Sequence, residues 1–427
     1  MTRIPFIAGL CLSATVILAA LYGIAPAHVP KLLVAAPAWL AAALLWMRAA
    51  PRTRKQAGAL GGIGLAGLAW GATHAGRIDP QLIFGSNALL IAMLAAVSFL
   101  RLITRPTGQG VEHIAHGRKA LWSTLLGVHL FGAVINLSVV FIMGDRLSAY
   151  RDLNARQVSV LTRGFSAAAF WSPFFAAMAA ALTYAPGAQL PQLMLLGIPL
   201  AALGLAITAL RKTDADADFE GYPMHYGTLW LPGTLAVLVL ALHETFPHWP
   251  ILAIICMLAP AVTLTFLGFS KRSAAAQLGT HLRQGLPAMA NELLLFLAAG
   301  LMAAGVDSAL STLHGWLPFT HFGGLQAALT LLFMYLVALA GVHPVIGIAV
   351  IGTLLAPLRP NPDLLAMTFL CSWAISVGTS PFSGMNLALQ GRYRIPPLDF
   401  LRWNGHYSLI MLCASMATLA AYGHWFA

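Results

Sequence analysis

Two apolar stretches decide the fold of this chain. Residues 120–143 read ALWSTLLGVHLFGAVINLSVVFIM, and residues 323–358 read GGLQAALTLLFMYLVALAGVHPVIGIAVIGTLLAPL. A helix needs about 20 apolar residues to cross the hydrocarbon core of a bilayer. At 24 and 36 residues, neither stretch is long enough for two crossings. The way they enter the membrane therefore fixes the orientation of every segment that follows them.

The rest of the chain has the composition of a membrane protein. Of its 427 residues, 59% are hydrophobic and only 9% are charged, whereas a soluble protein carries about a quarter charged residues. The sequence thus predicts an all-α polytopic membrane protein in contact with the lipid bilayer, with an uncleaved first helix and a cytoplasmic N-terminus. Eleven segments are predicted to span the membrane: 4–24, 31–48, 57–75, 82–103, 164–184, 191–210, 227–243, 251–269, 286–305, 363–390 and 405–424.

Positive charges choose between two topologies. If both decisive stretches are re-entrant, only Lys31, Arg77 and Arg359 lie outside, and the other 21 of the 24 Lys and Arg are cytoplasmic. If each stretch crosses once, the split is 12 to 12. Short cytoplasmic loops are enriched in Lys and Arg, so the re-entrant topology is favoured. The predicted location is a bacterial inner membrane. The same loops account for the net charge of +11 without any nucleic acid as partner.

Re-entrant backbone has a consequence for the interior. Amides and carbonyls that turn within the bilayer cannot face lipid, so they must be buried in protein or line a wet cavity. Two re-entrant hairpins therefore predict an internal, partly hydrated site.

Three short motifs recur in the same order in two halves of the chain. Asn87-Ala-Leu-Leu matches Asn291-Glu-Leu-Leu, Gly127-Val-His129 matches Gly341-Val-His343, and Ser172-Pro-Phe174 matches Ser380-Pro-Phe382. Charge counting places the first hairpin on the cytoplasmic side and the second on the outer side, which predicts inverted repeats. The expected domains are an N-terminal helix pair at 1–56, repeat 1 at 57–210, a linker loop and connecting helix at 211–250, and repeat 2 at 251–427.

A Ser-Pro dipeptide inside an apolar segment predicts a broken helix in each repeat, at 164–184 and at 363–390. Proline lacks the amide hydrogen and clashes with the preceding turn. Around the second dipeptide stand Gly378, Thr379, Ser380, Pro381, Ser383 and Asn386. Such an unwound segment offers oxygen ligands to a hard cation or to solute groups. The alternative is a plain proline kink with hydroxyls bonded back to the helix. The first repeat is poorer in polar groups, with Ser172 and Pro173.

Two histidines and one carboxylate are further candidates. His129 and His343, the latter followed by Pro344, are expected at the hairpin tips, where each could take a proton or donate to an anion. Each is alternatively a hydrogen-bonded core residue. Glu292 is the carboxylate well inside a predicted span, either for a coupling proton or as a paired helix-end charge. Asn87, Asn136 and Asn291 are expected to hydrogen-bond between helices.

The two opposed hairpins, each followed by a broken helix, resemble the ion transporter superfamily. Its members include divalent anion–sodium symporters, the large membrane subunit of TRAP transporters and arsenite permeases. Residues 292–310 resemble the helix before the outer hairpin, residues 341–352 resemble its tip, and residues 376–386 are similar to the Gly-Thr-Pro-Pro-Asn-like loop of the broken helix. The Ser-Asn-Thr motif of the symporters' tips is absent here. The resemblance implies alternating access, with a site between tips and broken helices.

These features predict a secondary active transporter of a small anionic solute such as an organic acid, coupled to sodium or protons, with a homodimer as a further expectation. No catalytic residues, and no metal other than sodium, are expected. A second hypothesis is a membrane-embedded enzyme that acts on a lipid-linked substrate, for which Glu112, His113 and His116 come closest. A third is a non-transporting membrane subunit of a larger complex.

Overall fold

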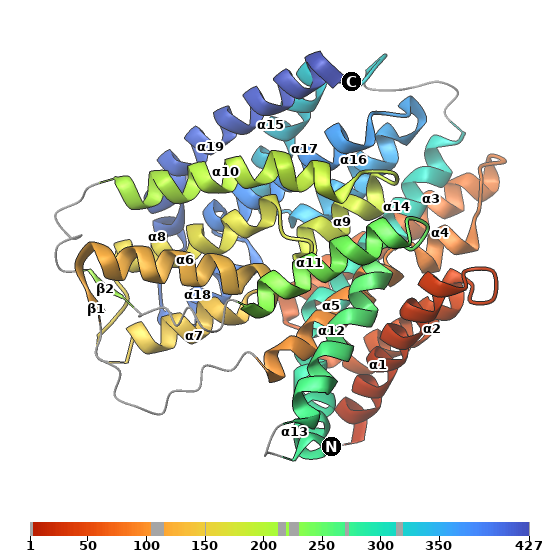
Figure 1. Ribbon diagram of the computed structural model, residues 1–427. Coiled ribbons are helices and arrows are strands. Elements are labelled where there is room, and N and C mark those ends of the chain that lie inside the picture. Colours follow the sequence, from red (N-terminus) through yellow and green to blue (C-terminus); the bar gives the residue numbers. More distant parts are fainter. Residues whose placement is uncertain are drawn as a thin grey trace. The chain divides into compact units, whose positions relative to one another are not determined.

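The computed structural model describes residues 3–103, 115–149, 151–211, 219–221, 230–269, 273–312 and 319–426 (Figure 1). These residues are helical apart from turns and one antiparallel pair of short strands, β1 (Ala115–His116) and β2 (Glu220–Gly221). Eight helices in the described part are long and apolar enough to cross a membrane, and three shorter apolar helices accompany them. The prediction of an all-α polytopic membrane protein is confirmed, although the long helices are eight in this part of the chain against the eleven predicted spans.

The chain forms two compact units. Unit 1 comprises Met1–Arg105, Thr234–Pro318 and Ala349–Ala356, and unit 2 comprises Pro106–Gly233, Phe319–Ile348 and Pro357–Ala427. Each unit draws on both halves of the sequence. Helix α16 (Pro344–Leu355) begins in unit 2 and ends in unit 1.

Unit 1 is a bundle of long apolar helices. Its helices are α1 (Arg3–Ile24), α2 (Lys31–Leu45), α3 (Pro51–Thr73), α4 (Pro80–Gly85), α5 (Ala88–Ser98), most of α11 (Trp230–Thr245), α12 (Ile251–Gly268), α13 (Ala274–Thr280) and α14 (Ala290–Leu310). Glycines bring α3 and α14 into backbone contact, since a Cβ atom added at Gly64 would lie 2.6 Å from the carbonyl oxygen of Leu301. Small residues allow such close approach between membrane helices.

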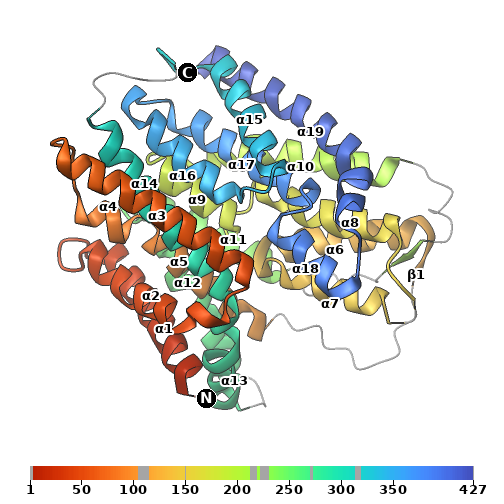
Figure 2. The same cartoon turned by 180° about the vertical axis from the view of Figure 1, so that it is seen from behind.

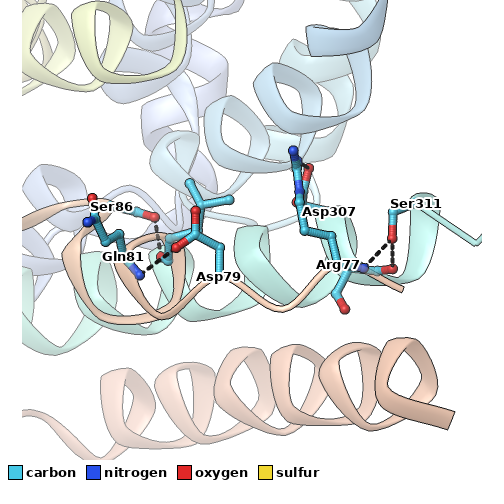
Figure 3. Close-up of polar contacts among 8 residues, drawn as sticks. Arg77, Asp79, Gln81, Ser86, Asp307 and Ser311 are labelled. Carbon is cyan, nitrogen blue, oxygen red and sulfur yellow. Dashed lines mark hydrogen bonds and ion pairs between the residues drawn. The ribbon is translucent and has the colours of Figure 1, made fainter. Parts of the chain in front are cut away.

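An ion pair fixes the connection after α3 to the end of α14 (Figure 3). The guanidinium of Arg77 contacts both carboxylate oxygens of Asp307, with the shortest distance 2.7 Å from Nη2 to Oδ2. Its backbone amide donates to Ser311 Oγ at 2.9 Å. The hydrogen bonds that Arg77 donates to the Asp307 carboxylate raise the pKa of its guanidinium. The Arg77 side chain is 63% exposed, so water screens this pair.

Unit 2 contains both Ser-Pro motifs. Its helices are α6 (Gly117–Ile135), α7 (Ser138–Leu147), α8 (Ala155–Ala167), α9 (Ala176–Tyr184), α10 (Leu190–Leu210), α15 (Gly324–Leu339), the start of α16, α17 (Pro362–Thr379), α18 (Gly384–Tyr393) and α19 (Pro397–Phe426). Every residue of α17 from Leu364 to Thr379 is buried, and α15, α17 and α19 lie side by side (Figure 2). A helix that is apolar on all sides belongs in a core of this kind.

Helix α8 differs from its prediction. The sequence placed the start of this segment at residue 164 and assigned Arg156 and Arg163 to a cytoplasmic loop. Instead α8 begins at Ala155, capped by the Asn154 side chain, and every residue from Arg156 to Ala167 is buried. The prediction was wrong because hydropathy cannot recognise a polar helix whose arginines find partners inside the protein.

Candidate functional site

Both predicted broken helices are present in unit 2. In the first, α8 continues through a 3-10 turn to Phe170, the chain unwinds over residues 171–175, and α9 follows. In the second, α17 ends at Thr379, residues 380–383 are unwound, and α18 follows. The break falls at the Ser-Pro dipeptide each time, because the proline cannot donate the next helical hydrogen bond.

The serine of each Ser-Pro dipeptide donates a hydrogen bond to a neighbouring helix, close to the turn that follows that helix. Ser172 Oγ donates to the carbonyl of Ala133 near the end of α6. Ser380 Oγ donates to the carbonyl of Ala338 near the end of α15, at 2.8 Å. In each repeat the acceptor stands three residues before a turn residue with positive φ, which is Asn136 (φ 55°) in one and Gly341 (φ 105°) in the other. We call these two contacts the serine latches.

The helix pairs joined by these turns have short second arms. Helix α7 has 10 residues, and α16 has 12 and continues through a 3-10 turn at Ala356–Leu358, so the two arms rise about 15 and 24 Å. The hydrocarbon core is about 30 Å thick. Arms of this length cannot cross it, which agrees with the re-entrant topology.

His129 is not at a hairpin tip. It lies within α6, seven residues before Asn136, and the match between Gly-Val-His motifs does not correspond to equivalent positions. Its Nδ1 lies 3.1 Å from the carbonyl oxygen of Gly164, and its Nε2 accepts from Trp171 Nε1 at 3.2 Å. A neutral imidazole makes both bonds. His129 is therefore a buried bridge between α6 and the first broken helix.

His343 does lie in the turn between α15 and α16, directly before Pro344. Its Nδ1 accepts from the backbone amide of Val345 at 3.2 Å, and its ring packs edge-on against Trp373 of α17, with ring centroids 5.4 Å apart. Pro344 is the first residue of α16, where its missing amide hydrogen costs nothing. The turn of the second helix pair thus rests on α17.

The second break is organised by Asn386, a fully buried residue of α18. Its Nδ2 lies 2.9 Å from the carbonyl oxygen of Ser380 and 3.3 Å from those of Val377 and Gly378. Ser383 Oγ also donates to Val377, at 2.7 Å. The Val377 carbonyl needs these partners because of Pro381. In a continuous helix this carbonyl would accept a hydrogen bond from the amide of residue 381, and proline has no amide hydrogen. Thr379 keeps its hydroxyl on its own helix, 3.0 Å from the carbonyl of Ile375.

Two residues of this site were missed by the sequence analysis. Asn404 of α19 donates through Nδ2 to the carbonyl of Gly378 at 2.9 Å. Its Oδ1 accepts from Arg163 Nε of α8 at 2.8 Å, and Arg163 also donates to the carbonyl of Trp403 at 2.6 Å. The Arg163 guanidinium stacks over the Tyr407 ring at 4.7 Å, and the residue is 3% exposed. The signal was a charged residue, Arg163, directly before the first predicted broken segment, which begins at residue 164.

No ion pair with a carboxylate is found for Arg163 within the described residues. A buried guanidinium with neutral partners leaves a positive charge inside unit 2. Such charges are costly in a membrane protein and usually serve its function. The described part of unit 2 therefore combines two unwound segments, their serine latches and the buried guanidinium of Arg163.

The other candidates lie elsewhere. Glu292 is exposed on α14 in unit 1, where Arg101 acts on it electrostatically. Asn87 donates to the carbonyl of Phe296 at 2.6 Å, and Asn291 accepts from the amide of Ala50 at 2.8 Å, both within unit 1. Of the residues considered for an enzyme, His116 lies in β1, whereas Glu112 and His113 are outside the described residues. Most of the predicted linker loop, 212–218, is also outside them.

Sodium, one of the two coupling ions that the sequence predicts, does not fit the second break as it is arranged. Each carbonyl oxygen has two lone pairs. The oxygens of Val377, Gly378 and Ser380 each have two donors within hydrogen-bond distance, and the two hydrogens of Asn386 Nδ2 are shared among all three. A hard cation needs several oxygen ligands with free lone pairs, and hydrogen-bond donors already stand in front of all three of these oxygens.

The described chain is thus a nearly all-helical, multi-pass membrane protein with two proline-broken helices in one compact unit. No family model matches the chain, and no curated protein matches it. Among solved structures, the crystal structure of the YdaH transporter of Alcanivorax borkumensis, described as revealing an unusual topology, is similar at 15% identity. The match covers 86% of this chain and 85% of that chain, with a TM-score of 0.45.

Proposed function

We propose that the chain is a secondary active transporter of a small organic anion that works by alternating access. The observation that carries this proposal is the pair of serine latches in unit 2. Each joins an unwound Ser-Pro segment to the end of a helix that leads into a tight turn. Unwound helices beside short re-entrant arms are the usual means by which transporters place a solute site in mid-membrane.

The charge of the site favours an anion. The buried Arg163 guanidinium supplies a positive charge whose hydrogen-bond partners among the described residues are all neutral. Helix α9 begins at Ala176 without a side-chain cap, so its first amides and the helix dipole add partial positive charge at the first break. An anionic solute would be stabilised by both, and a solute with the same charge as Arg163 would be repelled.

We also propose that an ion gradient drives transport. A gradient of sodium or protons is expected to power uptake, because no nucleotide-binding loop appears in the sequence. We also propose the bacterial inner membrane, with a cytoplasmic N-terminus, from the distribution of positive charge.

Transport is tested in proteoliposomes that contain the purified protein. Uptake of labelled organic acids is measured with an imposed sodium or proton gradient and with neither. We expect gradient-driven accumulation of at least one acid. Ser380→Ala should slow it, whereas Ser376→Ala, which removes a hydroxyl bonded only within α17, should not. Absence of flux for every acid under every gradient would refute the proposal.

Topology is tested by single cysteines at the two ends of the first helix pair. Arg118 and Arg146 lie near the start of α6 and the end of α7. A re-entrant pair predicts that both cysteines react with an impermeant maleimide from the same side. Labelling from opposite sides would remove the re-entrant geometry on which the proposed site depends.

A further inference from the structure

The second break supplies its own hydrogen-bond donors at the place where the sequence predicts oxygen ligands for a hard cation or for solute groups. The three carbonyl oxygens there face the amide group of one side chain, Asn386 Nδ2. An amide NH₂ group brings two positive hydrogens to a point where a sodium ion would need oxygen lone pairs. The Asn386 amide group therefore occupies the position that a sodium ion would take between these three oxygens.

A fixed charge strengthens the effect. Arg163 holds Asn404 through Oδ1, which turns the Asn404 amide hydrogens toward the carbonyl of Gly378. The same oxygen thus receives a donor that is itself oriented by a guanidinium. Any cation at the break would also be repelled by that guanidinium across a buried, weakly screened distance. The donors that face the carbonyl oxygens and the positive charge of Arg163 both disfavour a cation at the second break.

We propose that Asn386, with Asn404 and Arg163 behind it, replaces a coupling sodium ion, so that this carrier works without sodium. The inference rests on the proposed transport function and narrows it. The remaining driving forces are a proton gradient and exchange against a second solute. Asn386 and Asn404 are positioning residues for the second break, and Arg163 acts through Asn404.

Only Asn386 Oδ1 is a buried oxygen of this group without a hydrogen-bond partner. One amide oxygen cannot form the shell of several oxygens that a hard cation requires. A rotation of the Asn386 amide would bring Oδ1 against the three carbonyl oxygens, which is favourable only if a cation enters with it. Sodium binding by the unaltered protein is thus the outcome that overturns the proposal.

The test uses sodium alone and needs no known solute. Binding of ²²Na⁺ to the purified full-length protein is measured by scintillation proximity, with choline as the replacement cation. We expect no saturable binding by the wild-type protein. Asn386→Asp replaces the donor by a carboxylate, and it should raise ²²Na⁺ binding by at least about tenfold. One added charge beside the ion is worth more than the 1.4 kcal/mol that corresponds to tenfold.

Two further variants keep the result interpretable. Asn361→Asp is the matched control, because Asn361 caps the distant start of α17 and aspartate caps a helix equally well. It should bind no more ²²Na⁺ than wild type. Asn404→Asp is the second variant, for the case in which Asn386→Asp does not fold. It should fold, because the new carboxylate forms an ion pair with Arg163. It frees a lone pair on Gly378 and neutralises the guanidinium, so ²²Na⁺ binding should rise.

The outcomes separate this inference from the proposed function. Saturable ²²Na⁺ binding by the wild-type protein, or folded Asn386→Asp and Asn404→Asp variants that bind no more than Asn361→Asp, would overturn the inference. Sodium-dependent uptake in proteoliposomes would overturn it too and leave transport intact. Absence of any uptake would refute transport, whereas the ²²Na⁺ result would still decide whether the break accepts the ion.

Discussion

Removal of one serine latch should loosen one turn and leave the rest of unit 2 folded. Ser380→Ala deletes the 2.8 Å bond to the Ala338 carbonyl and the 3.3 Å bond accepted from the amide of Phe382. The Ala338 carbonyl keeps the amide of Gly341 at 3.1 Å, so no buried acceptor is left without a partner. Hydrogen bonds between membrane helices average about 0.6 kcal/mol, and the general range is about 0.5–1.5 kcal/mol.

We therefore expect a loss of about 1 kcal/mol in the local opening free energy of the turn, which is about a fivefold change. Hydrogen exchange in nanodiscs, followed by mass spectrometry, should detect it as about fivefold faster exchange at residues 340–345. Ser376→Ala is the control, because its hydroxyl bonds at 2.6 Å to Ser372 in the same helix. Equal exchange at the turn in both variants would show that the latch does not hold the helix pair.

Three further perturbations test other contacts. Gly64→Ala should destabilise unit 1 by about 1–3 kcal/mol in a denaturant titration through overpacking, whereas Gly62→Ala, which meets nothing within 4 Å, should not; identical midpoints would contradict the backbone contact. Asp307→Asn should cost less than about 1 kcal/mol because the ion pair with Arg77 is exposed; a large drop in melting temperature would show that the pair is stronger. His129→Gln should leave the pH profile of uptake unchanged, because the neutral imidazole only bridges two helices; a flattened profile would instead identify a proton carrier.

Much of the fold could be predicted from the sequence because apolar length and proline are local signals. The span predicted at 191–210 is the helix Leu190–Leu210, and that predicted at 251–269 is Ile251–Gly268. Both helix breaks were predicted at the Ser-Pro dipeptides, since the missing amide hydrogen acts wherever the proline stands. The turns were harder. A tripeptide match suggested His129, whereas the reversal depends on the backbone of Asn136, which adopts positive φ.

The candidate site was only half predictable. Asn386 was identified because it lies six residues from Ser380, in the motif itself. Asn404 and Arg163 are 241 positions apart in sequence and meet only after folding. Hydropathy assigned Arg163 to a loop, because a buried arginine can be recognised only when its partners are known. Local patterns therefore identify the break, and tertiary contacts determine which donors surround it.

The glycine contact between α3 and α14 restricts how unit 1 can deform. With Gly64 lying against the backbone of Leu301, any larger side chain at this position would meet main-chain atoms of α14. Gly67 lies against the backbone of Gly305 in the same way, so the close contact continues along both helices and they should move together. In a library of all single substitutions, nearly every replacement of Gly64 should lower the yield of folded protein. Replacements of Gly62, two residues earlier and with nothing within 4 Å, should be tolerated far better.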